Sequence, residues 1–169
     1  MGPDTTVDFM SKVIAATPAT RDQQHAHLIV DQDPTVPDRQ AALLGGGADP
    51  GPAMAAMARR LEQAGADFLV MPCNTAHAFA PAIVAAVSIP LLSIIEVTVA
   101  ACRGHGKPGI LATAGCVAAG LYQDAFAKAG TPPVLPDENA IAEISRLAVE
   151  IKRGERGADV AERMRAVAD

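Results

Sequence analysis

Aromatic residues, basic clusters and long hydrophobic runs are all scarce in this chain. Aromatic side chains make up 3% of the 169 residues, while half of the sequence is apolar. Small apolar side chains, alanine above all, must therefore form the core, which favours close packing of helices against strands. A net charge of −5 without a basic cluster argues against nucleic-acid binding. The most apolar stretch, residues 82–95, is too short to span a membrane and is broken by Ser88 and Pro90.

Cysteine is also rare, and its three occurrences are widely spaced. An odd number of distant cysteines is typical of reduced thiols in the cytoplasm. The sequence has neither a Cys-x-x-Cys nor a paired histidine motif, so a metal site is not expected. Asp4 and Asp8 interrupt the first turn after Met1, so the start does not resemble a secretion signal. We therefore expect a cytoplasmic protein without a bound metal.

Apolar periodicity alternates between helical and strand spacing along the chain. Helices are expected at residues 4–15, 53–64, 75–87, 96–102, 117–129, 138–153 and 158–168. Short strands are expected at residues 27–30, 68–71, 89–94, 109–113 and 133–135. Repeated strand–helix units build parallel sheets covered by helices, which bind ligands beyond the carboxyl ends of their strands. The sequence therefore predicts an α/β fold, with a first half at 1–103 and an incomplete second half at 104–169.

The most informative motif follows the strand expected at residues 68–71. Pro72 ends this strand, and Cys73 comes next, followed by Asn74 and Thr75, which favour helix starts. A cysteine in this place lies near outward-pointing N–H groups and the positive end of a helix dipole, which favour its thiolate. The same N–H groups can hold a carboxylate. The motif thus indicates a nucleophile or base beside an anion pocket.

Several stretches, in the right order, resemble the aspartate/glutamate racemase superfamily of cofactor-independent amino-acid racemases. Residues 1–6 look like the back half of that family's Gly-Gly-Met-Gly-Pro opening, and residues 37–39 look like its substrate-side arginine loop. Residues 71–77 are similar to its first cysteine motif, while 111–115 and 151–154 are weaker matches. The resemblance covers nearly the whole chain. It implies two pseudo-symmetric halves with the active site between them, no cofactor, and a homodimer.

In that family two cysteines face each other across the substrate. One removes the α-proton, and the other returns a proton from the opposite face. Cys73 matches the first cysteine, whereas the Leu-Gly-Cys-Thr-Glu motif of the second does not occur in the sequence. By this resemblance we expect a segment cut at both ends, each half lacking one strand. Unpaired strand edges and uncovered helix faces would make the chain marginally stable or self-associating.

The resemblance also implies contacts to the substrate. Asn74 and Thr75 would touch its carboxylate, although both residues equally suit plain helix capping. Arg39 would clamp a carboxylate with its two-pronged guanidinium. Thr113, at the end of a strand, is implied as a pocket residue. Lys152 is a weaker candidate, because a lysine in the last turn of a helix also complements the helix dipole.

Two further side chains are candidates for the missing second base. Cys116 follows the turn that begins at Thr113, but its position does not match the family's second cysteine. His77 lies four residues after Cys73, which allows a Cys–His pair, although a histidine that packs or caps locally is the commoner case. Cys102 lies within an apolar helix and is expected in the core.

Together these features predict a racemase or epimerase of the aspartate/glutamate type that moves the α-proton of a small anionic amino acid through a thiol. Two alternatives remain open. One is a related decarboxylase or maleate-type isomerase, although decarboxylases of this kind keep the second cysteine. The other is an inactive remnant that binds a dicarboxylate without turnover.

Overall fold

The computed structural model describes residues 2–155 and 157–168, which fold into two compact units. The first unit takes the chain up to residue 38 together with residues 48–94. The second takes residues 39–47 and the chain from residue 95 onward. The division at residue 103 that the sequence suggests stays a prediction. None of the helices in the described part of the chain is long and apolar enough to cross a membrane.

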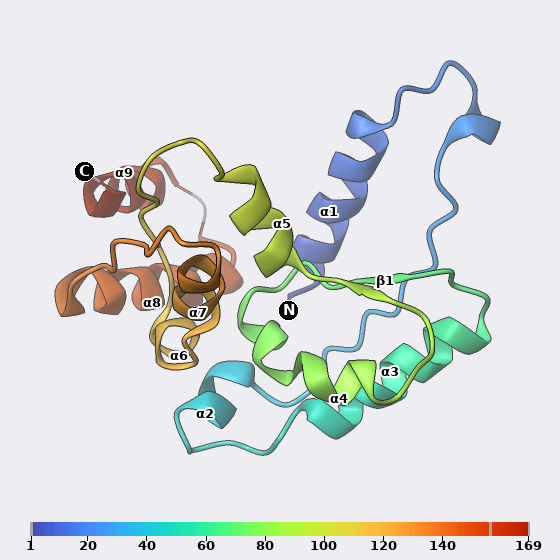
Figure 1. Ribbon diagram of the computed structural model, residues 1–169, viewed down its shortest axis with the longest axis horizontal. Helices are drawn as coiled ribbons and strands as arrows, with labels where there is room; N and C mark the ends of the chain where they lie inside the picture. Colours follow the sequence, from blue (N-terminus) through green and yellow to red (C-terminus); the bar gives the residue numbers. More distant parts are fainter. Residues whose placement is uncertain (1, 156, 169) are drawn as a thin grey trace. The chain divides into compact units, whose positions relative to one another are not determined.

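The first unit combines two short parallel strands with helices. Its elements are α1 (Pro3–Ala16), η1 (Asp22–Gln24), α3 (Gly51–Gln63), β1 (Leu69–Val70), η2 (Thr75–Phe79), α4 (Ala80–Val84) and β2 (Leu91–Leu92). β1 and β2 pair in parallel, with Leu69 opposite Leu91. Helices α3 and α4 pack against each other and run along the same side of the strand pair (Figure 1). The strands are short, so most of this unit's backbone hydrogen bonds lie in helices and turns.

Alternation along β1 separates a covered face from an open one. Leu69 is 5% exposed and packs with Met54, Ala58 and Ile83 from the two helices. Its neighbour Val70 is 43% exposed, because successive side chains of a strand point to opposite faces. One face of the pair therefore lies in the core, while the other presents apolar side chains to the surroundings.

The second unit is mostly helical. Its elements are α2 (Arg39–Leu43), α5 (Ile94–Ala101), α6 (Ala114–Ala118), α7 (Leu121–Lys128), α8 (Glu138–Lys152) and α9 (Ala158–Ala168), although the first residue of α5 belongs to the first unit. Gly109 and Val134 form an isolated parallel bridge. The core consists of the buried side chains of Val99, Ile110, Ala112, Cys116 and Phe126.

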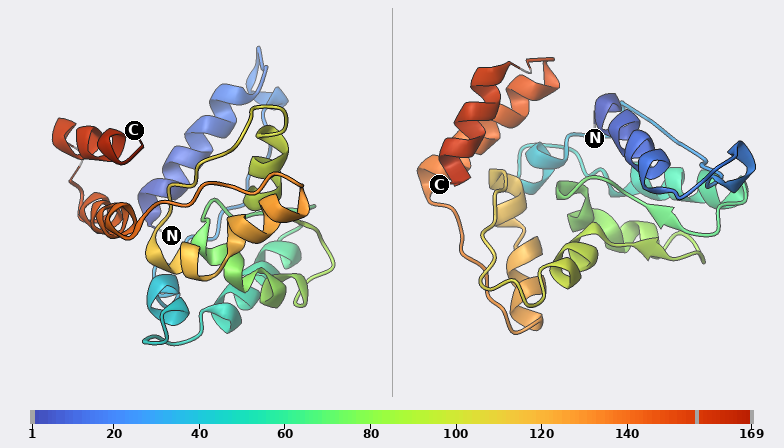
Figure 2. Two further views of the ribbon diagram at one scale, coloured as in Figure 1. Left: turned by 60° about the vertical axis from the view of Figure 1, so that its left-hand side comes forward. Right: turned by 90° about the horizontal axis from the view of Figure 1, so that it is seen from above.

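Helices α8 and α9 lie side by side, as both views of Figure 2 show. The guanidinium of Arg163 on α9 lies 2.7 Å from the carboxylates of both Glu143 and Glu150 on α8. Its hydrogen bond lowers the pKa of Glu143. At the start of α8, the Oδ1 atom of Asp137 accepts a hydrogen bond from the N–H of Ala140 at 2.8 Å. The predicted cap at Asp137 is therefore confirmed.

Helix predictions hold best where the local signals agree. The helices expected at 4–15, 53–64, 96–102, 138–153 and 158–168 are confirmed within two residues at each end. The strands expected at 68–71 and 89–94 are present but reduced to two residues each. Gly65 follows α3 with a φ of 92°, which suits the predicted C-terminal cap.

Other predicted elements are wrong or divided. Residues 27–30 are irregular, and within the described chain they pair with no strand. The strands expected at 109–113 and 133–135 shrink to the single bridge. The helix expected at 117–129 is divided into α6 and α7 at Gly120, whose φ of 65° is left-handed and interrupts an α-helix. The sequence pattern predicts neither helix α2 nor η1.

Candidate functional site

Cys73 lies in a tight turn directly after β1. Its N–H donates to the carbonyl of Met71 at 2.7 Å, and this two-residue spacing makes Pro72 the centre of a γ-turn. Proline suits the place because its ring holds φ near the value that the turn needs. The Cys73 side chain is half-buried against the core of the first unit, and the next residue, Asn74, is exposed. The thiol therefore sits between core and surface at the carboxyl end of a strand.

The turn leads into η2 and not into the long helix predicted for residues 75–87. The first hydrogen bond of η2 joins the N–H of His77 to the carbonyl of Asn74 at 3.0 Å. The N–H groups of Thr75 and Ala76 therefore come before the first hydrogen bond of this helix. A new helix, α4, then begins with Pro81 in its first turn, because proline lacks the N–H that a helix interior requires. Five residues of 3-10 helix align few peptide dipoles. The predicted effect of a helix dipole on the thiol is therefore reduced to that of the nearest N–H groups.

His77 is buried next to this turn and is 7% exposed. Its Nδ1 atom lies 2.8 Å from the carbonyl oxygen of Cys73. Its Nε2 atom accepts a hydrogen bond from the N–H of Ile94 at 3.2 Å. Burial lowers the pKa of His77, and the hydrogen bond to the Cys73 carbonyl opposes this effect. The histidine thus contacts the main chain of Cys73.

Thr113 precedes α6 in the second unit, and its side chain lies in a polar cluster. The Nε2 atom of Gln40 donates to the Oγ1 of Thr113, and the Oε1 of Gln40 accepts from the N–H of Gly115 at 2.8 Å. The Oγ of Ser145 accepts from the N–H of Ala114 at 3.1 Å. A Cβ atom at position 115 would displace the Gln40 amide from this arrangement. The Thr113 hydroxyl and the first N–H groups of α6 therefore form hydrogen bonds with side chains of the protein itself.

The remaining candidates also belong to the second unit. Arg39 is the first residue of α2 rather than a loop residue, and α2 packs against α6, which follows Thr113. Lys152 is the exposed last residue of α8. Cys116 is 3% exposed within the core. Cys102 packs against the same core as expected, although it follows the last residue of α5 and does not lie within the helix. Gln40 was missed because only the packing of α2 on α6 reveals its role.

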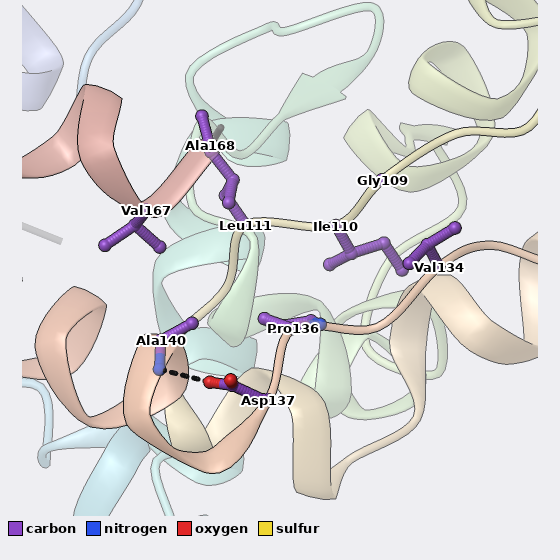
Figure 3. A pocket seen from close by; sticks show the side chains of 9 residues that line it. All are labelled: Gly109, Ile110, Leu111, Val134, Pro136, Asp137, Ala140, Val167 and Ala168. Carbon is purple, nitrogen blue, oxygen red and sulfur yellow. Dashed lines mark hydrogen bonds between the residues drawn. The ribbon is translucent and has the colours of Figure 1, made fainter.

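An open trough of about 420 Å³ lies beside the bridge of the second unit. Figure 3 shows that the apolar side chains of Ile110, Leu111 and Val134 line it, together with the end of α9. Its single charged lining residue, Asp137, is engaged as the cap of α8. Among the described residues, neither a predicted site residue nor a Lys or Arg side chain lines this trough, so it offers no cationic group to an anionic substrate.

The candidates thus fall into two sets with different chemistry. The first unit carries Cys73, Asn74 and Thr75 between the turn after β1 and the start of η2, and the second unit carries Arg39, Thr113 and Lys152. A thiol beside N–H donors can exchange a proton with a carbon acid, whereas the second set offers donors for carboxylates. Among the described residues, no three His, Cys, Asp or Glu side chains gather in a way that could hold a metal ion.

The chain is similar to known amino-acid racemases. A family model described as Asp/Glu/Hydantoin racemase matches residues 1–169. The chain is 31% identical over 137 residues to the broad specificity amino-acid racemase RacX of Bacillus subtilis. This match covers 73% of the chain and 56% of RacX, so the chain spans little more than half the length of this curated relative.

Solved structures show the same fold. The aspartate racemase of Picrophilus torridus matches with a TM-score of 0.83 and 25% identity, over 99% of this chain and 69% of that one. A proposed Asp/Glu racemase of Yersinia pestis matches with a TM-score of 0.73 and 22% identity, over 97% of this chain and 74% of that one. The predicted α/β class is therefore confirmed. Because the family model matches from end to end, the chain belongs to the Asp/Glu/Hydantoin racemase family.

Proposed function

We propose that this chain acts as a cofactor-independent amino-acid racemase or epimerase of the aspartate/glutamate type, with Cys73 as the group that exchanges the α-proton. The position of Cys73 carries the proposal. A half-buried thiol follows a parallel strand in a tight turn, at the edge where parallel sheets bind their ligands. The match to the racemase family over the whole chain supports the same chemistry.

The proposed reaction is a proton transfer at carbon. The Cys73 thiolate takes the α-proton of the amino acid, and the electron pair left on the α-carbon spreads into the adjacent carboxylate. Return of a proton to the same face restores the substrate, whereas return to the opposite face gives its mirror image. Because an α-proton is weakly acidic, orientation of the substrate and donors aimed at the developing charge must supply most of the rate.

The other candidate residues are proposed to bind carboxylates. Asn74, Thr75 and the N–H groups of their turn would face the charge that develops beside Cys73. Arg39 would hold a carboxylate through two parallel hydrogen bonds, with Thr113 and Lys152 as further donors. Two carboxylate sites favour a dicarboxylic amino acid such as aspartate or glutamate. Racemisation also requires a group that returns a proton to the opposite face, and the Leu-Gly-Cys-Thr-Glu motif of the family's second cysteine does not occur in the given sequence. We therefore expect exchange of the α-proton with solvent to be faster than racemisation.

Independence from pyridoxal phosphate is part of the proposal. That cofactor is attached through a lysine, whose amine becomes reactive when it is desolvated in a pocket. The sequence has four lysines, and the side chains of all four are exposed: Lys12, Lys107, Lys128 and Lys152. Their exposure supports a reaction that does not use pyridoxal phosphate.

We further propose a cytoplasmic location and a homodimer. All three cysteines are free thiols, which persist in the reducing cytoplasm. The open apolar face of the β1–β2 pair is a surface that association would cover.

Exchange of the α-proton with solvent tests the proposed activity. L- and D-aspartate and glutamate are incubated with the protein in D2O, and loss of the α-proton signal is followed by proton NMR. We expect measurable exchange that falls by about a hundredfold in Cys73→Ser, because a positioned general base contributes at least this factor. Cys102→Ser is the matched control, since this thiol is partly buried against the second core.

Two outcomes would contradict the proposal. One is exchange at an unchanged rate in Cys73→Ser. The other is an absence of exchange with every substrate although aspartate raises the melting temperature, which would indicate binding without turnover.

A further inference from the structure

One buried side chain links the ends of the two parallel strands in the first unit. His77 lies in η2, four residues after Cys73, and contacts the Cys73 carbonyl through Nδ1 at 2.8 Å. Through Nε2 it accepts the N–H of Ile94 at 3.2 Å. Ile94 is the first residue of α5 and follows β2 by two positions. The ring therefore ties the turn after β1 to the segment after β2.

These two partners determine where the proton of the ring lies. A carbonyl oxygen can only accept a hydrogen bond, so Nδ1 must carry a proton. A backbone N–H can only donate, so Nε2 must be unprotonated. The imidazole is therefore neutral with its proton on Nδ1, and both nitrogens are engaged. It cannot take a proton from the Cys73 thiol without losing one of these bonds.

The main chain of Cys73 is held on both sides. Its N–H donates to the carbonyl of Met71 at 2.7 Å, and its own carbonyl accepts from His77. Since both flanking peptide groups are fixed, the direction of the Cα–Cβ bond is fixed as well, and only the χ1 rotamer remains to place the sulfur. A displacement of about 1 Å in a reacting group can reduce a rate by about a hundredfold.

We infer that His77 is a positioning residue that anchors the Cys73 main chain to the β2–α5 junction and so directs the thiol. For catalysis this inference rests on the proposed function. The protonation pattern of the ring and the anchoring of the turn rest on the hydrogen bonds alone. They can therefore be tested separately.

Two substitutions of His77 and one control substitution separate the effect of its hydrogen bonds from a general effect of mutation in this unit. His77→Ala removes both hydrogen bonds, whereas His77→Asn retains an N–H donor close to the place of Nδ1. Ser88→Ala is the control, because Ser88 bonds to Glu62 at 2.6 Å and so links the segment before β2 to α3 in the same unit. Steady-state constants for α-proton exchange are measured for each variant, with amide NMR spectra to verify the fold.

We expect His77→Ala to lower kcat by at least about tenfold while KM changes by less than about threefold, because the substrate contacts remain and the thiol is misdirected. His77→Asn should recover most of this loss, and Ser88→Ala should match the wild type. Long-range nitrogen–proton spectra of the wild type should show the proton on Nδ1. A proton on Nε2, or a His77→Asn variant as slow as His77→Ala, would overturn the inference.

Labelling of the thiol distinguishes failure of this inference from failure of the proposed function. The rate at which iodoacetamide modifies Cys73 is measured by peptide mass spectrometry relative to Cys102 in the same sample. This ratio should rise by about threefold or more in His77→Ala, because a turn without its anchor opens more often, and His77→Asn should restore it. If the wild type exchanges no α-proton but these ratios follow the expected pattern, the proposed function fails and the anchoring role stands. If exchange occurs while the ratios stay equal, the anchoring role fails.

Discussion

At the scale of single residues, burial of an imidazole makes stability depend on pH. An imidazolium could not accept the N–H of Ile94, and burial disfavours its charge, so the pKa of His77 lies below its ordinary value of 6.5. The folded protein therefore binds this proton less readily than the unfolded chain does. When the unfolded state binds more protons, stability rises with pH.

We predict that the free energy of unfolding decreases as the pH falls through about 6.5, where the unfolded chain begins to protonate His77. For one group the slope cannot exceed about 1.4 kcal/mol per pH unit. Urea denaturation at several pH values would measure it for the wild type and for His77→Asn, which has no titrating ring. The wild type should show the steeper loss below this pH. Parallel curves for the two proteins would refute the prediction.

Some residue-level features follow from sequence and others do not. The turn at Cys73 could be predicted because Pro72 ends a strand by local chemistry. The bond between His77 and Ile94 and the bond between Gln40 and Gly115 could not be predicted, because these partners lie 17 and 75 residues apart in sequence. The chemical role of Cys73 is a proposal that labelling and kinetics test.

At the scale of elements, the start of α8 depends on one carboxylate. The first N–H groups of a helix lack partners within the helix, and Asp137 satisfies that of Ala140. The side chain also places negative charge at the positive end of the helix dipole. Helix α8 also carries the buried Leu147 and both carboxylates that bind Arg163. Loss of its cap therefore weakens the packing of the helix as well as its first turn.

We predict that Asp137→Ala lowers the free energy of unfolding by about 1 kcal/mol, the usual effect of removing a helix cap. Chemical denaturation followed by circular dichroism would measure this loss. Asp137→Asn is the matched control, since its amide oxygen can still accept the N–H of Ala140. The explanation fails if the asparagine variant loses as much stability as the alanine variant.

Element boundaries were predictable where a breaker or a cap acts locally. The helix expected at 75–87 contains Pro81, which could have revealed the break after η2, and Gly120 could have revealed the end of α6. The strand expected at 27–30 could not be excluded in this way. A strand requires a partner for its backbone groups, and only the fold decides which segments pair.

At the scale of the whole molecule, the open face of the β1–β2 pair is an exposed apolar surface of the first unit. Phe68, Val70 and Leu92 are all exposed there. Contiguous exposed apolar side chains favour association with another surface. The face opposite to them is already packed on α3 and α4.

We predict that the average mass in sedimentation equilibrium rises with protein concentration. The double variant Val70→Thr with Leu92→Thr keeps β-branched or strand-compatible side chains but removes apolar area, and it should weaken association by about tenfold or more. Val84→Thr, an exposed position on α4, is the control and should associate like the wild type. A wild type that stays monomeric at all concentrations would contradict the prediction.

The fold class was accessible from sequence because alternating strand and helix patterns restrict a chain to few architectures. The sequence was less informative about which residues belong to which unit. Residues 39–47 belong to the second unit although the first unit precedes and follows them in sequence. Their assignment depends on the packing of α2 against α6, which no local pattern indicates.

This interleaving limits how the protein can be dissected genetically. A gene fragment that begins at codon 95 would encode most of the second unit without α2, and hence without the Gln40 amide that bonds to Thr113 and Gly115. A fragment that ends at codon 94 would carry α2 without its helical partner. To produce the second unit separately, for example for isotope labelling, codons 39–47 should be placed directly before codon 95 and joined to it by a short linker.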